Sequence, residues 1–367
     1  MALLKRLIPR KLLILGMLAL TALVLTAACS DDDDETLKLG FLADFSGPIA
    51  EFGPVIQTGV ELAIEHINAG GGVLGNDVIF VTGDTALDAT QAVEEARRLI
   101  EIEGVHAIIG PLSSSVTLAV SASVTVDAKI PMISPSATSP ALSSVDDDGF
   151  LFRSTTSDAA QGVVLAGLAA DEGFDNVGVL FLNDAYGQGL AEAFENAFMG
   201  TVTSASYEDG AASYLAELQQ AAGGGATVLV AIGFPTQAEI FVREALENSI
   251  FDTFLFVDGT KSQALIDAIG AENLEGFKGT APGAGPESPG LSAWNSAYIA
   301  KYGELPSVPF VREAYDATIA IALAAQFAGS VDGTAIRDAL AKVAAPGGTA
   351  YIPGAEGVAA ALKAVKD

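Results

Sequence analysis

The stretch LKLGFLADFSGPIAEFGPVIQTGVELAIEHINA, residues 37–69, decides the fold of this chain. Its first seven residues form a nearly continuous apolar run, which is typical of a strand buried on both faces of a parallel sheet. Residues 55–69 follow with apolar side chains at helical spacing. A strand followed by an amphipathic helix is the repeating half of a βαβ unit, so this stretch predicts a parallel sheet covered by helices.

The same alternation continues to residue 257. Strands are expected at 78–81, 105–109, 130–133 and 150–153, and then in a second series at 177–182, 202–207, 227–232 and 254–257. Helical patterns lie between them, at 89–102, 114–127, 185–198, 214–222 and 237–248. Two successive series of this kind predict an α/β protein with two doubly wound, Rossmann-like lobes.

The glycine- and proline-rich segment GFKGTAPGAGPESPG, residues 276–290, interrupts the alternation and is interpreted as a crossover between the lobes. Helices are expected after it, at 292–302, 310–327, 334–343 and 355–365. We assign residues 37–155 and 282–328 to lobe 1 and residues 156–281 and 329–367 to lobe 2. The chain would then cross between the lobes in a hinge near 154–158, 279–284 and 326–332.

The N-terminus has the order of a lipoprotein signal. Basic residues between Lys5 and Lys11 precede an apolar run that ends at Cys29, and the acidic tract Asp31–Glu35 follows. This order predicts a signal peptide over 1–28, lipidation of Cys29 and a solvated acidic tether over 29–36. Thr26 stands where such signals usually have leucine. A buried cysteine and a single membrane-spanning helix are the alternatives, although the run is short beside the ~20 residues that a span needs.

Composition limits the partners of this chain. Cys29 is the only cysteine among 367 residues, so no disulfide can stabilise the fold. The formal net charge of −28 becomes more negative once the basic leader is removed, and such a surface repels nucleic acid and anionic membranes. We expect no nucleic-acid partner and contact with the membrane only through the lipid.

The inventory of reactive residues does not indicate an enzyme. His66 and His106 are far apart, have no ligands at metal-binding spacing and are interpreted as structural. There is no G-x-S-x-G motif for a nucleophilic serine, and the glycines at 283 and 285 lack the strand and helix of a dinucleotide fingerprint. We therefore expect no metal, no cofactor and no covalent chemistry.

Two hydroxyl-rich loops follow predicted strands of lobe 1. They are GPLSSS, residues 110–115, and SPSAT, residues 134–138. Each loop could simply cap the helix that it opens. In open parallel sheets, however, ligands bind outside the carboxyl ends of the strands, where helix N-termini favour an anionic group. Together the two loops could hold a carboxylate without an arginine.

Eight short sequence motifs connect the chain to a known family. They are LGFLADFSGPIAEFG (39–53), GVELAIEHINAGGGVLGN (59–76), IIGPLSSS (108–115), IPMISPSATSPAL (130–142), FRSTTSDAAQG (152–162), NDAYGQGL (183–190), FVDGTKSQALIDAIG (256–270) and REAYDATIAIALA (312–324). In this content and order the chain resembles the type I periplasmic binding proteins of the branched-chain amino-acid (Leu/Ile/Val-binding) ABC transporter family. The resemblance covers nearly the whole chain after Cys29.

The resemblance implies a ligand site divided between the lobes. The ligand carboxylate would be bound by Ser114, Ser136, Ala137 and Thr138, and the ligand ammonium by Asp258. Phe52, Tyr186 and Phe234 would form the aromatic cleft, with Phe234 at a position that is tyrosine in some relatives. Relatives usually end with a further short strand, whereas this sequence stops at Asp367. Lobe 2 would therefore lack an edge strand, or the sequence is a fragment.

The function implied by the resemblance is that of an extracytoplasmic, lipid-anchored substrate-binding protein. It would be a monomer, in the periplasm or on the outer face of the cell membrane. It would bind a branched-chain or other apolar amino acid in the cleft between its lobes, close around it and deliver it to the permease subunits of an ABC importer. Two alternatives stay open: a sensory receptor of the same fold, and a binder of an amide, urea or aromatic acid. An exported enzyme is disfavoured by the missing reactive residues.

Overall fold

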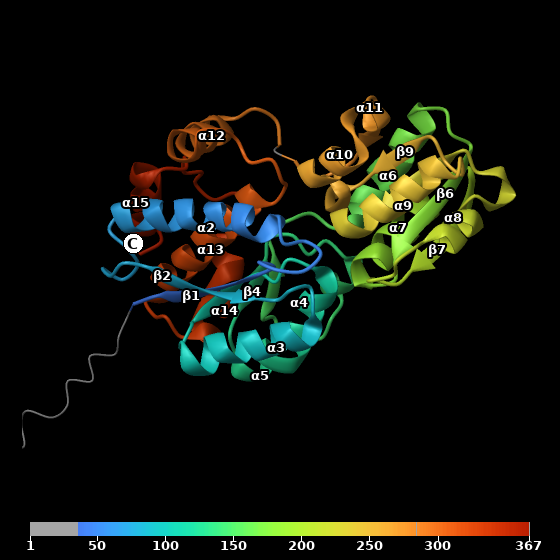
Figure 1. Cartoon of the computed structure of the whole chain (residues 1–367). Coiled ribbons are helices and arrows are strands. Elements are labelled where there is room, and N and C mark those ends of the chain that lie inside the picture. Colours follow the sequence, from blue (N-terminus) through green and yellow to red (C-terminus); the bar gives the residue numbers. More distant parts are fainter. Residues whose placement is uncertain (1–35, 284, 367) are drawn as a thin grey trace, which may run out of the picture. The chain divides into compact units, whose positions relative to one another are not determined.

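The computed structural model describes residues 36–283 and 285–366. The predicted signal peptide, Cys29 and all of the predicted tether except Thr36 lie outside these residues. The described part contains two five-stranded parallel sheets (Figure 1). The strands are β1 (Lys38–Ala43), β2 (Ile79–Asp84), β3 (Ala107–Ile109), β4 (Met132–Ser134), β5 (Leu151–Arg153), β6 (Asn176–Leu182), β7 (Thr201–Tyr207), β8 (Val228–Ile232), β9 (Phe254–Phe256) and β10 (Lys278–Gly279).

Helices alternate with the strands and then follow them. They are α2 (Phe52–Ala69), α3 (Ala89–Arg97), α4 (Ser114–Val120), α5 (Val126–Ala128), α6 (Asp158–Asp171), α7 (Ala185–Ala197), α8 (Leu215–Ala221), α9 (Pro235–Glu247), α10 (Gln263–Ile269), α11 (Ala271–Leu274), α12 (Pro289–Tyr302), α13 (Val311–Ala328), α14 (Gly333–Val343) and α15 (Ala355–Ala364). Short 3-10 or π-helical turns are η1 (Arg98–Ile102), η2 (Ser121–Thr125), η3 (Pro140–Ser143), η4 (Gly223–Gly225) and η5 (Asp258–Thr260).

The position of each strand in its sheet follows its sequence. The strand orders are β2-β1-β3-β4-β5 and β10-β9-β8-β6-β7. The apolar strands β1 and β8 are inside the sheets and almost wholly buried, whereas the threonine- and serine-rich strand β7 is at an edge and half-exposed. Parallel strands covered on both faces must be apolar throughout, and an edge strand need not be. The predicted fold class is confirmed.

We call the sheet β1–β5 with its helices lobe 1, and the sheet β6–β10 with its helices lobe 2. The chain passes from lobe 1 to lobe 2 between β5 and α6, and α12 and α13 then pack against α2 of lobe 1. The hydroxyls of Thr58 and Tyr298 are 2.7 Å apart. A Cβ atom at Gly59 would lie 2.1 Å from the carbonyl oxygen of Val311, so α2 and α13 can cross this closely only because residue 59 is glycine.

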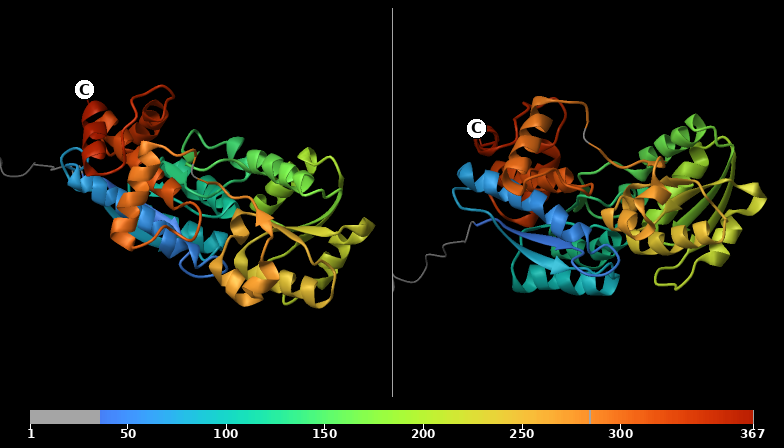
Figure 2. Two further views of the ribbon diagram at one scale, coloured as in Figure 1. Left: turned by 90° about the horizontal axis from the view of Figure 1, so that it is seen from above. Right: turned by 45° about the horizontal axis from the view of Figure 1, so that its top comes forward.

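The structure corrects the predicted place of the C-terminal segment. Residues 329–367 were assigned to lobe 2, but α14 packs on α13 and α15 packs on α2 and α13. The Arg337 guanidinium donates to the carbonyl oxygen of Asp148 at 2.6 Å and covers the ring of Phe150, both in lobe 1. The red helix α15 lies beside blue α2 (Figures 1 and 2). The predicted third crossing near 326–332 is therefore wrong, because the apolar face of α14 is buried against lobe 1.

Strand β10 lies inside the glycine-rich segment and was not predicted, because two residues carry no periodicity.

Within residues 36–283 and 285–366, no single helix is long and apolar enough to cross a membrane. The pair Val311–Ala328 and Gly333–Val343 meets the length and composition criteria only jointly, and it is bent by 108°.

Candidate functional site

The strand orders place one crevice at the carboxyl ends of both sheets. In lobe 1 the winding reverses between β1 and β3, and in lobe 2 it reverses between β6 and β8. Ligands of open parallel sheets bind outside the strand ends at such reversal points. The segments that follow these four strands contain, in order, Phe52, Ser114, Tyr186 and Phe234.

A small cavity of about 30 Å³ lies between these segments. Its walls come from both lobes: Ile49, Phe52, Ile56, Leu112, Ser113, Ser114, Ser136 and Phe310 belong to lobe 1, and Tyr186, Phe234, Asp258 and Gly259 to lobe 2. Space of this size holds about one water molecule. The two lobes therefore meet at this cavity in the described structure.

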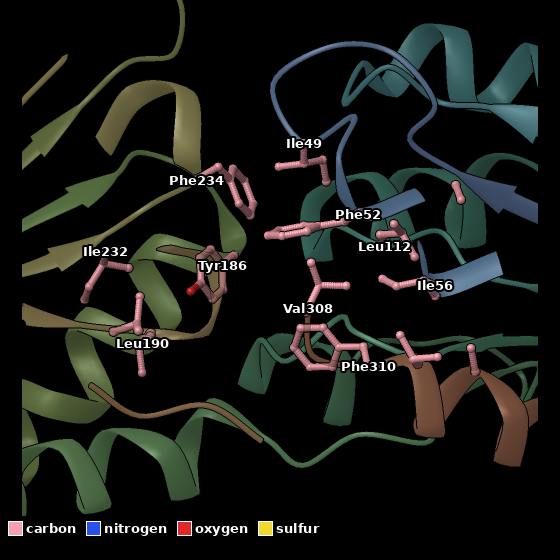
Figure 3. Close-up of a cluster of buried hydrophobic side chains, with 14 of the residues drawn as sticks. Ile49, Phe52, Ile56, Leu112, Tyr186, Leu190, Ile232, Phe234, Val308 and Phe310 are labelled. Atoms are coloured by element: carbon pink, nitrogen blue, oxygen red, sulfur yellow. The ribbon is translucent and has the colours of Figure 1, made fainter. Parts of the chain in front are cut away.

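Aromatic and branched side chains meet across this cavity. The rings of Tyr186 and Phe234 are stacked, with centroids 5.4 Å apart and an interplanar angle of 18°. Figure 3 shows this pair facing Ile49 and Phe52 of lobe 1. All four side chains are buried. This part of the cavity can accept an apolar group, and the stacked rings can cover it.

Phe310 belongs to the same apolar wall and has a strained backbone. It precedes the first residue of α13, with φ of 74° in the left-handed region, and its side chain is buried. A residue with a Cβ atom adopts this conformation at a cost of roughly 1–2 kcal/mol. Strain of this kind is found at ligand sites, where the surrounding structure maintains it. Phe310 was not among the predicted site residues.

The two hydroxyl-rich loops meet at the lobe 1 side of the cavity. Ser114 Oγ accepts a hydrogen bond from the Ser139 amide at 3.2 Å, and Ser136 Oγ donates to the carbonyl oxygen of Leu112 at 2.9 Å. The Ala137 amide donates to Ser134 Oγ at 3.0 Å. Thr138 Oγ1 is buried without a hydrogen-bond partner. Ser114 and Ser136 line the cavity, whereas Ala137 and Thr138 are buried outside its lining.

Asp258 is the acidic group of the cavity, at the start of the η5 turn that follows β9. Its Oδ1 accepts hydrogen bonds from Gln161 Nε2 at 2.7 Å and from the Tyr186 hydroxyl at 3.0 Å. The Tyr186 hydroxyl also accepts a hydrogen bond from the Gly259 amide at 3.2 Å. Burial raises the pKa of Asp258, and these hydrogen bonds oppose the rise. The carboxyl group is thus fixed in position by neutral donors.

A second buried carboxyl group, that of Asp158, lies beside the first. Asp158 is the first residue of α6, is fully buried, and has no hydrogen-bond partner on either carboxylate oxygen. Burial, followed by the charge of Asp258, raises the pKa of Asp158 to about 8. The rise is opposed by the Thr138 hydroxyl, which lies near this carboxyl group but outside hydrogen-bond geometry, and by the charge of Arg153. The Arg153 guanidinium donates to the carbonyl oxygens of Thr138 and Ser139 at 3.0 and 2.9 Å. The two carboxyl groups create a place where a cation would be stabilised.

The structure thus gathers six of the predicted residues around one cavity: Phe52, Ser114, Ser136, Tyr186, Phe234 and Asp258. Sequence reasoning missed Asp158 and Phe310. Asp158 follows Ser157 at a helix start, where an acidic residue is common for helix stability alone. The available signal was the three-residue spacing of Asp158 and Gln161, which places both on one face of α6; Gln161 donates to Asp258, and the charge of Asp258 acts on Asp158.

The two histidines have partners within the protein, as predicted. His66 Nδ1 is 2.8 Å from the Tyr315 hydroxyl, and His106 Nδ1 accepts the Lys38 amide at 3.1 Å. In the described part of the chain, no three histidine, cysteine or acidic residues are grouped so that they could hold a metal ion.

Comparison with known proteins shows the family of this chain. Residues 36–359 match the family model described as periplasmic binding protein. The chain is 29% identical over 313 residues to a leucine-, isoleucine-, valine-, threonine- and alanine-binding protein of Pseudomonas aeruginosa, covering 83% of this chain and 82% of that protein. It is 26% identical over 334 residues to the chemotactic signal transduction substrate-binding protein BasB of Halobacterium salinarum, covering 84% and 75%. The crystal structure of the leucine-binding protein LivK of Thermotoga maritima superposes with a TM-score of 0.77 at 27% identity, covering 88% and 90%.

Proposed function

Because the chain belongs to the periplasmic binding protein family, we propose that it binds a free amino acid with an apolar side chain between its two lobes and delivers it to an ABC importer. In this proposal the chain makes and breaks no covalent bond. It recognises the ligand at three places: an ammonium site, a carboxylate site and an apolar wall. The lobes close on the ligand, and the closed form is the one that the permease subunits recognise.

The observation that carries the proposal is the pair of buried carboxyl groups, Asp158 and Asp258. Two acidic groups in one buried place destabilise the protein unless a cation or a proton neutralises them. The Arg153 guanidinium is occupied by two backbone carbonyls and forms no ion pair with Asp158 in the described structure. An α-ammonium group would supply the missing positive charge, with the Tyr186 hydroxyl and Gln161 holding Asp258 in place.

The ligand carboxylate, on the same carbon as the ammonium, would meet neutral dipoles. Ser114 is the first residue of α4, where the helix dipole favours a negative charge. Its hydroxyl and those of Ser136 and Thr138 would bind the ligand carboxylate, together with nearby amides. The body of the ligand would lie against Phe52, Phe310 and the Tyr186–Phe234 stack. A zwitterion with an apolar side chain complements all three surfaces.

The burial of the cavity supports a closing mechanism. Phe52, Phe234 and Asp258 line it and are buried, so ligand entry requires the lobes to separate. The ligand then touches groups of both lobes, and it stabilises whichever lobe arrangement allows all of these contacts. The lobes are connected between β5 and α6 and between β10 and α12, and these two connections would act as the hinge.

Location and attachment complete the proposal. We infer an extracytoplasmic protein that acts as a monomer and is held at the membrane by a lipid on Cys29, a residue outside the described structure. The sequence order of basic residues, apolar run and cysteine supports this inference. The strongly negative net charge makes direct contact with anionic lipid unfavourable.

A second candidate function is a sensory one. The similarity to BasB, a substrate-binding protein of a chemotactic signalling system, favours it, and the ligand site would be the same. The two functions differ only in the partner of the closed form. Co-purification of the ligand-loaded full-length protein with permease subunits would support import, and co-purification with a chemoreceptor instead would support sensing.

The test of the ligand class is a thermal-shift screen of the full-length protein in detergent. It compares leucine, isoleucine and valine with matched compounds that lack the ammonium, such as 4-methylpentanoate, and with leucinamide and aromatic acids. We expect the melting temperature to rise with the amino acids alone. A larger rise with an aromatic acid or with 4-methylpentanoate would contradict the proposal.

A further inference from the structure

A direct contact joins the lobes just outside the cavity. Ser115, in α4 of lobe 1, reaches the N-terminus of α7 in lobe 2. Its hydroxyl donates to Asp184 Oδ2 at 3.1 Å and accepts the Ala185 amide at 2.9 Å. Asp184 is the N-cap of α7, and its Oδ1 accepts the Gly187 amide at 2.8 Å. One serine of lobe 1 therefore binds both the capping carboxylate and a free amide of this helix end.

The next turn of α7 also approaches lobe 1. A Cβ atom at Gly189 would lie 2.7 Å from Pro140 Cδ and 3.0 Å from Ser139 Oγ, both at the η3 turn. The proline ring cannot swing aside as a long side chain can. A residue larger than glycine at 189 would thus keep α7 away from η3.

These contacts adjoin the ligand site without being part of it. Ser115, Asp184 and Gly189 do not line the cavity, but Ser114 and Tyr186, the chain neighbours of Ser115 and Ala185, do. We infer that Ser115 and Gly189 form an inter-lobe latch, a contact that sets how far the lobes are closed before ligand arrives. The latch would determine affinity without touching the ligand; its effect on affinity rests on the proposed function.

The physical basis is the equilibrium between open and closed lobes. When the lobes separate, water replaces both hydrogen bonds of Ser115, so the latch favours closure only modestly. A ligand whose binding requires closure has an apparent dissociation constant that depends on the population of the competent form. Ser115 and Gly189 are thus positioning residues, and their substitution should change affinity equally for every ligand.

The first test measures closure without any ligand. The full-length protein carries Cys29→Ser and nitroxide labels at Ile102→Cys in lobe 1 and Met199→Cys in lobe 2, two side chains that are 77% and 97% exposed. Pulsed electron paramagnetic resonance then gives the distance between the lobes. We expect Ser115→Ala to reduce the short-distance population and Gly189→Ala to remove most of it.

Two matched variants serve as controls. Gly167→Ala changes a glycine inside α6 at which a Cβ atom would meet nothing within 4 Å, and Ser296→Ala removes a hydroxyl that bonds only within α12. Both controls should keep the wild-type distances. Because alanine favours a helix over glycine, neither Gly189→Ala nor Gly167→Ala should lower the melting temperature.

The second test measures affinity by calorimetry. Ser115→Ala should weaken binding of leucine and valine by about tenfold each, the loss expected for one or two ordinary hydrogen bonds, and should leave their order unchanged. Gly189→Ala should weaken both at least as much. Wild-type distances, or wild-type affinities, in both variants would overturn the latch. If no amino acid binds even the wild type, the proposed function fails, while the ligand-free distances still decide whether the latch exists.

Discussion

The carboxyl groups of Asp158 and Asp258 lie close enough that the charge of Asp258 contributes to the raised pKa of Asp158, which burial and this charge together bring to about 8. Asp258 is held by two neutral donors, whereas Asp158 has none on either oxygen. Burial and the neighbouring carboxyl group therefore favour a proton on Asp158 at neutral pH, since its pKa is about 8. A bound ammonium would replace that proton.

Ligand binding should therefore release a proton. The pKa of Asp158 in the ligand-free protein is about 8, and a neighbouring ammonium would lower it. Affinity should rise as the pH increases from 6 to 8, by at most about tenfold per pH unit, and level off above the ligand-free pKa. Calorimetry in phosphate and in Tris at pH 7 would show the proton as a difference in observed enthalpy. The same enthalpy in both buffers would contradict proton release.

Asp158→Asn should make the protein more stable while weakening its binding of ligand. Because the pKa of Asp158 is raised above its unfolded value, the native protein holds a proton that the unfolded chain loses, and this group's contribution to stability falls as the pH rises from about 4 to 8. An amide carries no such charge. At pH 8 we expect the free energy of unfolding of the variant to exceed that of the wild type by about 1–3 kcal/mol. We also expect the variant to bind leucine more weakly. Denaturant titrations at pH 5 and 8 would check this, since the gain must be larger at pH 8.

Substitutions at the carboxylate site should weaken leucine binding less than substitutions at the ammonium site. Ser114→Ala and Thr138→Ala each remove one of the three hydroxyls of this site, while amides and the other two hydroxyls remain, so each should weaken leucine binding by ~1.5–3 kcal/mol. Ser144→Ala, an exposed serine that bonds only the carbonyl oxygen of Ala141, is the matched control. Calorimetric dissociation constants unchanged by both site variants would place the carboxylate elsewhere.

The lipid anchor is tested on the only cysteine. Metabolic labelling with palmitate should mark the wild-type protein and not Cys29→Ser, and the variant should leave the membrane fraction. One acyl chain alone holds a protein only weakly, so release should follow the loss of every chain attached through this thiol. Equal labelling of both proteins would rule out lipidation at Cys29.

Much of the fold could be predicted from the sequence because buried parallel strands are nearly continuous apolar runs. β1 and β8 are examples, and nine of the ten strands in the described structure lie at predicted places. The placement of residues 329–367 could not be predicted in this way. The apolar stripe of α14 must be buried against another element, but the sequence does not specify which one. In the structure α14 packs on α13, which belongs to lobe 1.

The candidate site likewise contains residues that the sequence indicated and residues that only the structure revealed. Ser114, Tyr186 and Asp258 belong to sequence motifs with a familiar order, so resemblance pointed to them. Asp158 and Phe310 required coordinates: the carboxylate of Asp158 gains its importance from burial beside Asp258, and Phe310 from a left-handed backbone that brings its ring to the cavity. Neither burial nor φ can be read from residue type alone.

Recognition of the ligand ammonium by the two carboxyl groups is the central claim, and one calorimetric comparison tests it most directly. Leucine and 4-methylpentanoate, which differ only in the ammonium, are titrated into the full-length wild type and into Asp258→Asn. Loss of one partner of a buried charge pair costs ~2–5 kcal/mol, so leucine should bind the wild type at least about thirtyfold more tightly than 4-methylpentanoate, and Asp258→Asn should abolish most of that difference. Equal affinities for the two compounds in the wild type, or an undiminished preference for leucine in Asp258→Asn, would contradict it.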